Sequence, residues 1–104
     1  MYTVIEVDDF QREANILLTH LERLALISFL AENPTAGDVV PGSGGCRKLR
    51  WAISGTGKRG GARVIYFNQL TQGYIFLIAI YAKSVTSDIP AHLLRAIKKT
   101  SDEI

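Results

Sequence analysis

The chain has 104 residues, of which 47% are hydrophobic and 21% charged, and its formal net charge at pH 7 is +2. This length suits one domain over residues 1–104, and the composition excludes a disordered chain. The longest apolar run, residues 74–82, is shorter than the roughly 20 residues of a membrane helix, and no signal-peptide pattern follows Met1, so we expect a cytoplasmic protein without membrane contact. Cys46 is the only cysteine and is predicted to be a small buried side chain, and neither histidine has metal-ligand spacing, so we expect no disulfide, metal or small-molecule cofactor.

The first elements are predicted to be a strand and a helix. Residues 2–7 alternate and are rich in Val, Ile and Thr, which is typical of a short strand. The apolar residues between positions 10 and 18 follow the spacing of one helical face, and Asp8 or Asp9 is expected to cap this helix.

A second helix and a connector follow. Thr19 and Glu22 have the spacing of a capping box, in which each side chain bonds the other residue's backbone N–H at a helix start. Pro34 cannot continue a helix and disfavours helical geometry at Asn33, so we expect this helix to end near Asn33. Repeated glycine and proline breaks predict that residues 34–45 form a connector.

The middle of the chain predicts three successive strands. Residues 46–53, 62–70 and 74–83 are rich in β-branched and aromatic residues and are bounded by glycine-bearing turns. The break at residues 71–73 is short enough for a hairpin, whereas residues 54–61 form a longer loop. We therefore expect an antiparallel meander.

The last element is predicted to be a helix. Pro90 suits its first turn, Asp88 is a possible cap, and Lys98 and Lys99 suit its C-terminal dipole. The predicted order is βααβββα. This order is typical of an α+β domain in which an antiparallel sheet packs against helices on one face.

Positive charge is concentrated in the segment predicted to form the strands. No Asp or Glu lies between Asp38 and Asp88, and seven of the twelve Lys and Arg residues lie between positions 39 and 87, while the rest of the chain carries five basic and ten acidic residues. Several aromatic residues are interspersed among these cations. This pattern indicates a surface for a polyanion such as a nucleic acid, and the alternative is a solvated strand face that confers solubility.

Strand periodicity groups several of these cations. Lys48 and Arg50 lie two residues apart and are therefore expected on one exposed face. Alternation does not place Arg63 cleanly, although its position near a strand start leaves room for exposure. Tyr81 and Lys83 share a face at the end of the last strand, so cations from three strands are expected to converge.

The residue types in the basic segment limit the kinds of binding and catalysis that are expected of this protein. The glycine-rich loop at residues 54–61 lacks the P-loop string and joins two strands, so nucleotide binding is not expected, although Lys58 and Arg59 at its tip can follow a nucleic-acid backbone. No pair of acids and no Ser, His and Asp set can be placed together in the basic segment. If the protein is an enzyme, its cations and tyrosines suit phosphoryl transfer, because Arg and Lys stabilise charge on a pentacoordinate phosphorus.

Three stretches of the chain resemble the HigB branch of the RelE-like toxins of bacterial toxin–antitoxin modules. They are 36-AGDVVPGSGGCRKLRWA-52, 57-GKRGGARVIYF-67 and 77-LIAIYAKS-84, and the resemblance covers most of the chain. The predicted βααβββα order agrees with this family. The resemblance implies a ribosome-dependent, metal-independent endoribonuclease that cuts mRNA in the decoding site through the 2′-hydroxyl, inhibits translation, and is silenced by a cognate antitoxin.

The resemblance also implies roles for individual residues. Lys48 and Arg50 match basic residues that line the active-site face of the family, and Arg63 matches an arginine that stabilises the transition state. Tyr81 and Lys83 match a pair at the end of the last strand in the family, and we assign them to substrate orientation and proton transfer. The residues expected to hold RNA or the ribosome are Arg47, Lys58, Arg59 and Tyr66.

Other possibilities stay open. Many relatives place a further catalytic Arg, His or Tyr after the last strand, where this chain has residues 84–88, so the general base is not assigned. A non-catalytic binding module, either a degenerate toxin or a small nucleic-acid-binding protein, would use the same basic face and would tolerate Arg63→Lys, which a catalytic arginine should not. The apolar faces of the first two helices are expected to form the antitoxin groove in addition to the catalytic site.

Overall fold

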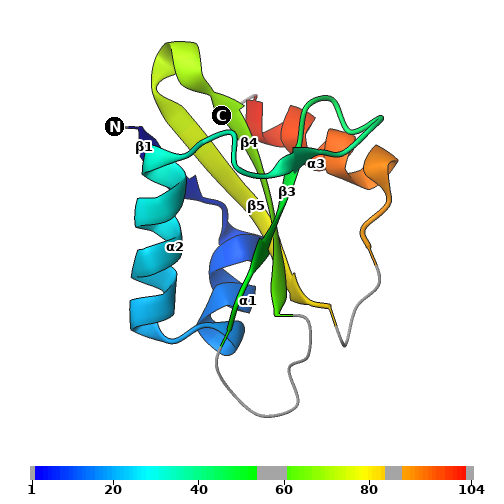
Figure 1. The fold of residues 1–104 in the computed structure, drawn as a ribbon. Coiled ribbons are helices and arrows are strands. Elements are labelled where there is room, and N and C mark those ends of the chain that lie inside the picture. The colour runs from blue at the N-terminus through cyan, green and yellow to red at the C-terminus, as the bar shows by residue number, and fades with distance from the viewer. Residues whose placement is uncertain (1, 54–60, 84–87, 103–104) are drawn as a thin grey trace.

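A five-stranded mixed sheet runs through the centre of the molecule and is covered by helices (Figure 1). The computed structural model describes residues 2–53, 61–83 and 88–102. The strands are β1 (Thr3–Glu6), β2 (Asp38–Val39), β3 (Arg47–Trp51), β4 (Ala62–Gln69) and β5 (Tyr74–Ala82). The helices found in this part of the chain are α1 (Asp8–Leu17), α2 (His20–Glu32), α3 (Ala91–Asp102) and the short 3-10 turn η1 (Leu70–Gln72).

The strand order is β1-β5-β4-β3-β2, and β3, β4 and β5 form the predicted antiparallel meander. The prediction of a wholly antiparallel sheet was wrong, because β1 pairs with β5 in parallel. The predicted connector also contains β2, which pairs antiparallel with β3. Alternation identifies a strand but carries no information about which distant strand it will pair with, and this is why both features were missed.

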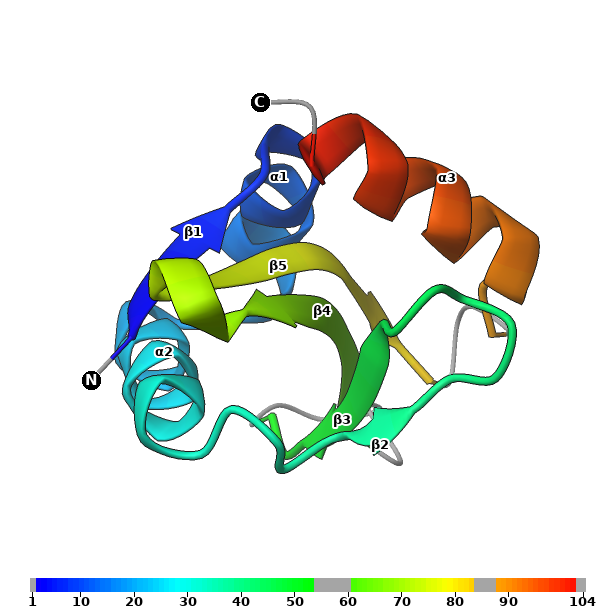
Figure 2. The same ribbon diagram turned by 90° about the horizontal axis from the view of Figure 1, so that it is seen from above.

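The helices cover both faces of the sheet, so the prediction of helices on one face was also wrong (Figure 2). On one face, Phe10 of α1 and Leu26 of α2 pack against strand residues such as Val64. On the other face, Leu94 of α3 packs with Phe67 and with other apolar residues of the strands. Strands that are buried on both faces have nearly continuous apolar sequences, and β4 and β5 have this composition.

The helix boundaries follow local chemistry. The capping box at the start of α2 is confirmed, since the Glu22 N–H donates to Thr19 Oγ1 at 3.1 Å and the Thr19 N–H donates to Glu22 Oε1 at 2.8 Å. The predicted end near Asn33 is confirmed as well. Asp8 and Asp9 do not cap α1 but lie in its first turn, where the helix dipole favours acidic side chains.

Cys46 is fully buried, as predicted. Of the helices in the described residues, none has the length and apolar character needed to cross a membrane.

Candidate functional site

Four of the predicted site residues project from the α3 face of the sheet. Arg50, Arg63 and Tyr81 occupy directly paired positions on β3, β4 and β5, so they form a row across three strands. Lys48 lies two residues before Arg50 on β3 and therefore on the same face. Cations were predicted to converge from three strands, but Lys48, Arg50 and Arg63 come from β3 and β4 only, and Lys83 lies in the turn after β5.

A β-bulge in β5 is needed to bring Tyr81 to this row. The register with β4 shifts between Ile65 and Tyr66, where the pairing skips Ile78 of β5. Phe76 and Tyr81 both pack in the core beneath α3, although they are five residues apart and strict alternation would place them on opposite faces. The extra residue therefore turns the end of β5 so that Tyr81 lies beside Arg63.

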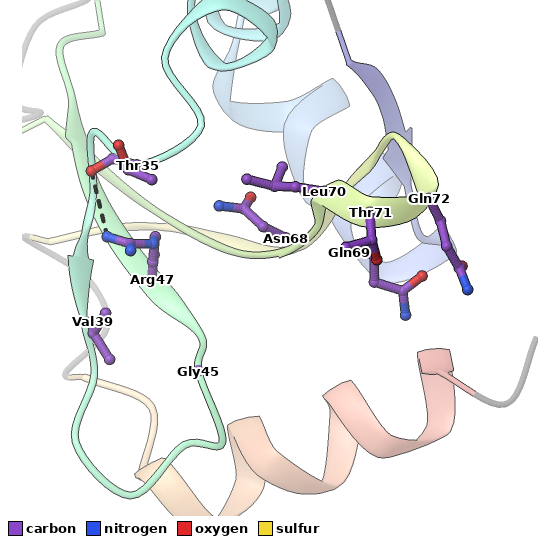
Figure 3. A pocket seen from close by; sticks show the side chains of 9 residues that line it. All are labelled: Thr35, Val39, Gly45, Arg47, Asn68, Gln69, Leu70, Thr71 and Gln72. Carbon is purple, nitrogen blue, oxygen red and sulfur yellow. Dashed lines mark hydrogen bonds between the residues drawn. The ribbon is translucent and has the colours of Figure 1, made fainter.

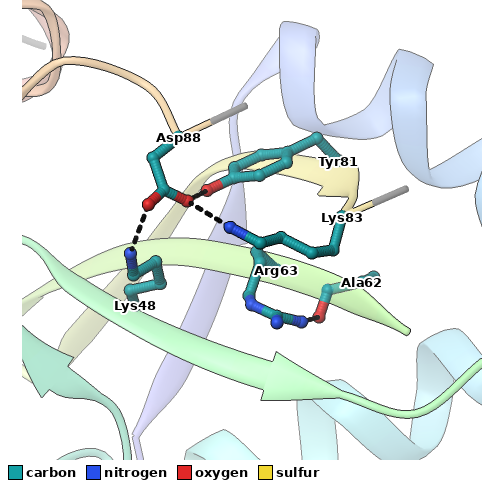
Figure 4. Close-up of polar contacts among 6 residues, drawn as sticks. All are labelled: Lys48, Ala62, Arg63, Tyr81, Lys83 and Asp88. Carbon is teal, nitrogen blue, oxygen red and sulfur yellow. Dashed lines mark hydrogen bonds and ion pairs between the residues drawn. The ribbon is translucent and has the colours of Figure 1, made fainter. Parts of the chain in front are cut away.

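Asp88, which lies in the segment leading into α3, completes the cluster (Figure 4). The Tyr81 hydroxyl donates to Asp88 Oδ1 at 3.0 Å, and Lys83 Nζ lies 3.4 Å from the same oxygen. Lys48 Nζ lies 3.3 Å from Asp88 Oδ2. The Asp88 carboxylate is therefore contacted by donor groups from β3, from β5 and from the turn after β5.

These contacts set the protonation states of the cluster. The hydrogen bond from Tyr81, followed by the hydrogen bond and charge of Lys48, lowers the pKa of Asp88 below its usual value. Burial, reinforced by the hydrogen bond and charge of Asp88, raises the pKa of Tyr81 to about 12. At neutral pH, Asp88 is therefore a carboxylate and Tyr81 is a neutral phenol that can donate a proton.

Positive charge exceeds negative charge at this site. Arg63 is only 8% exposed, and its Nη1 donates to the Ala62 carbonyl at 3.5 Å. Its register partner on β3 is Arg50, which is exposed, and like charges directly opposite each other in a sheet destabilise it. Lys48 and Lys83 contact the Asp88 carboxylate, and Arg50 and Arg63 lie in register with Tyr81. Among the described residues of this cluster, four cations therefore accompany one carboxylate, and this excess of positive charge attracts an anion.

Tyr66, predicted to contact RNA, lies elsewhere. Its side chain is fully buried in the core beneath α1 and α2. Its hydroxyl donates to the Pro34 carbonyl at 2.9 Å and accepts from the Gly37 N–H at 2.9 Å, and burial raises the pKa of this phenol. The expectation that Tyr66 binds RNA is corrected, because its ring is not accessible and its hydroxyl anchors the connector before β2.

Arg47 is also separated from the cluster, because it precedes Lys48 and faces the other side of the sheet. Its Nη1 donates to the Gly37 carbonyl at 2.7 Å and to the Thr35 carbonyl at 3.4 Å. It lines a pocket of about 670 Å³ together with residues of the β4–β5 hairpin (Figure 3). The other two predicted RNA contacts, Lys58 and Arg59, lie outside the described residues.

Asp88 has a role that its place in the sequence did not predict. The sequence predicts only a possible helix cap there, whereas in the structure its side chain contacts Lys48, Tyr81 and Lys83. The available signal was its position as the first acid after Asp38, five residues beyond Lys83. Sequence spacing alone did not show that the chain turns back over the sheet at this point.

The arrangement can bind an oxyanion and supply a proton from a neutral phenol. Within residues 2–53, 61–83 and 88–102, no group of three His, Cys, Asp or Glu side chains is placed to hold a metal ion. No model of a known protein family matches the chain.

Proposed function

We propose that this protein is a RelE/HigB-like toxin, a ribosome-dependent endoribonuclease that cleaves mRNA, inhibits translation and is silenced by a cognate antitoxin. One observation carries the proposal. Three of the five residues with implied catalytic roles, Lys48, Tyr81 and Lys83, contact one carboxylate (Figure 4). The other two, Arg50 and Arg63, lie in register with Tyr81 on neighbouring strands. The α+β architecture with its β3–β4–β5 meander supports a RelE-like fold.

The cations suit cleavage through the 2′-hydroxyl of the RNA. In this reaction the 2′-hydroxyl releases its proton to water and the 2′-oxygen forms a bond to the adjacent phosphorus. The bond from phosphorus to the 5′-oxygen breaks, leaving a 2′,3′-cyclic phosphate and, once the 5′-oxygen is protonated, a 5′-hydroxyl. Negative charge builds up on the phosphoryl oxygens of the transition state. Arg63 and Lys48 would stabilise this charge, and Arg63 is held in a nearly solvent-free position where such an interaction is strengthened.

The tyrosine suits the proton transfer. The leaving 5′-oxygen needs a proton, and Tyr81 is a neutral phenol at neutral pH because its pKa is raised to about 12. Lys83, the other member of the implied pair, lies beside it and contacts the same carboxylate oxygen. We assign Tyr81 to protonation of the leaving group and Lys83 to orientation of the phosphate.

The antitoxin would bind away from this site. α1 and α2 expose aliphatic side chains at Ile16, Leu21 and Leu24, whose exposed fractions are 70%, 77% and 47%. Exposed aliphatic side chains on two consecutive helices support a protein-binding surface there. These residues lie on the helices that cover the sheet face opposite the cation cluster.

The test is a translation reaction with purified ribosomes and a reporter mRNA, analysed by primer extension. The wild-type protein should produce cuts that require ongoing translation, and Arg63→Ala and Lys83→Ala should abolish them. Arg12→Ala is the matched control, because Arg12 is an exposed arginine of α1 that pairs with Asp9 on the acidic half of the molecule.

Cuts that persist in both site variants would contradict the proposed catalytic site. Intact mRNA with folded wild-type protein, together with normal growth when the protein is expressed in cells, would contradict the nuclease assignment. That result would favour the alternative, a non-catalytic module that binds nucleic acid through the same basic face.

A further inference from the structure

We propose that the Asp88 carboxylate occupies, in the free protein, the site of an RNA phosphate, so that Lys48, Tyr81 and Lys83 form an oxyanion-binding site that RNA enters by displacing Asp88. The identification of the anion as an RNA phosphodiester rests on the proposed function. The anion site itself rests on the contacts of Asp88.

The donors at this site can bind either the Asp88 carboxylate or an RNA phosphodiester. Lys48 and Lys83 present ammonium groups at 3.3 and 3.4 Å, and Tyr81 presents a hydroxyl at 3.0 Å. A carboxylate and a phosphodiester both carry one negative charge shared by two oxygens, and both accept hydrogen bonds without donating any. The donors that bind the Asp88 oxygens can therefore bind the oxygens of a phosphate.

The contacts of Asp88 are those of an exchangeable ligand. Its side chain is 51% exposed, and its two lysine partners are also exposed in part. The ion pair between Arg23 and Glu6 is different, because its N–O distance is 2.8 Å and both side chains are less than 20% exposed. Ion pairs open to water contribute little to stability, so displacement of Asp88 should cost little.

The surrounding charges favour the exchange. Arg63 and Arg50 lie in the same row as Tyr81 and add two positive charges beside the groups that bind Asp88. A phosphate that joined the site without displacing Asp88 would meet a like charge, whereas one that replaced it would keep the donors satisfied. A transition state with added negative charge would be stabilised further by the two arginines.

The experiment measures RNA binding without cleavage. A short unstructured RNA oligomer with 2′-O-methyl groups, which removes the nucleophile, is titrated with protein and followed by fluorescence anisotropy. Asp88→Ala and Asp88→Asn should bind this oligomer about 10-fold more tightly than the wild type, which is about 1.4 kcal/mol. The matched control is Asp38→Asn, because Asp38 is an exposed acid paired in register with Lys48 and its loss changes the net charge by the same amount.

Four outcomes would overturn the inference. Unchanged binding by both Asp88 variants would show that Asp88 does not compete with RNA for the site. Weaker binding by both variants would show that Asp88 holds the cations in place for RNA. Equal tightening by Asp38→Asn would show that only net charge matters. The fourth outcome is measured on the wild-type protein. Its Asp88 carboxyl ¹³C resonance should shift when the oligomer is added, because the carboxylate loses its hydrogen-bond donors. An unchanged resonance at saturation would contradict displacement even if the variants fail to fold.

The two proposals can fail separately. Oligomer binding requires neither ribosomes nor cleavage, so tighter binding by the Asp88 variants would stand even if the wild-type protein cut no mRNA. Conversely, translation-dependent cleavage together with unchanged binding by these variants would leave the nuclease assignment intact and would rule out the displacement of Asp88 by RNA.

Discussion

Tyr81 and Asp88 are joined by a hydrogen bond of 3.0 Å in which the buried phenol donates to a half-exposed carboxylate. This bond ties the end of β5 to the segment that leads into α3, and it lies next to Lys48 and Lys83. Both partners have shifted pKa values, so the pair can be followed by titration.

The first prediction is that Tyr81 titrates with a pKa of about 12, above the usual tyrosine value of about 10. The folded pKa lies above the unfolded one, so the stability that neutral Tyr81 contributes is complete below about pH 10 and is lost as the pH rises through about 12. Ultraviolet absorbance of the phenolate should show a step near pH 12 that Tyr81→Phe removes. Asp88→Asn should lower this pKa without restoring the usual value, because burial is its largest cause. A Tyr81 step near pH 10 would contradict the described environment.

The second prediction concerns the guanidinium of Arg63. Arg63→Lys should retain the charge but lose the planar fork of donors, so the rate of translation-dependent cleavage should fall by about 10²- to 10³-fold, the usual cost of losing one preorganised donor. Affinity for the 2′-O-methyl oligomer should change by less than about threefold, because both side chains neutralise phosphate. Lys48→Arg, which preserves charge at an ammonium position, serves as the comparison. Full cleavage activity in Arg63→Lys would instead indicate a binding role.

The third prediction concerns the capping box of α2. Thr19→Ala should lower the free energy of unfolding by about 1 kcal/mol, because the N–H of Glu22 loses its side-chain acceptor at the helix start. Urea denaturation monitored by circular dichroism measures this change. Thr19→Ser keeps the acceptor and should stay close to the wild type, and RNA binding should be unchanged in both variants. Equal loss in the two variants would attribute the effect to the threonine methyl group.

The fourth prediction tests the corrected role of Tyr66. Tyr66→Phe removes the hydroxyl that accepts from the buried Gly37 N–H, so the free energy of unfolding should fall by about 1–3 kcal/mol. Affinity for the RNA oligomer should not change, because the ring lies in the core beneath α1 and α2. Tyr74→Phe, at a tyrosine that is 38% exposed, is the control and should be close to neutral. Weaker RNA binding by a folded Tyr66→Phe variant would show that Tyr66 contributes to RNA binding, as the sequence predicted.

Several features of the fold were predictable because they depend on neighbours in the sequence. The capping box needs only Thr19 and Glu22 at the right spacing, and the β3–β4–β5 meander needs only three strand-forming segments joined by turns. The grouping of Lys48 with Arg50 follows from the two-residue period of a strand.

Other features depend on residues far apart in the chain. The parallel pairing of β1 with β5 joins segments about 70 residues apart, and the position of α3 on the second sheet face depends on how the whole apolar surface is buried. The bulge at Ile78 follows from the packing of β5 against its neighbours, and it decides that Tyr81 faces Arg63.

The sequence by itself determined the helices and the meander strands, the basic character of the middle segment, and the candidate cations, because these properties come from local backbone preference and composition. Only the tertiary structure decided that Tyr66 is a core residue and that Asp88 lies at the centre of the cation cluster. The physical reason is that burial and side-chain contacts depend on which distant segments pack together, and periodicity along one segment does not specify its partner.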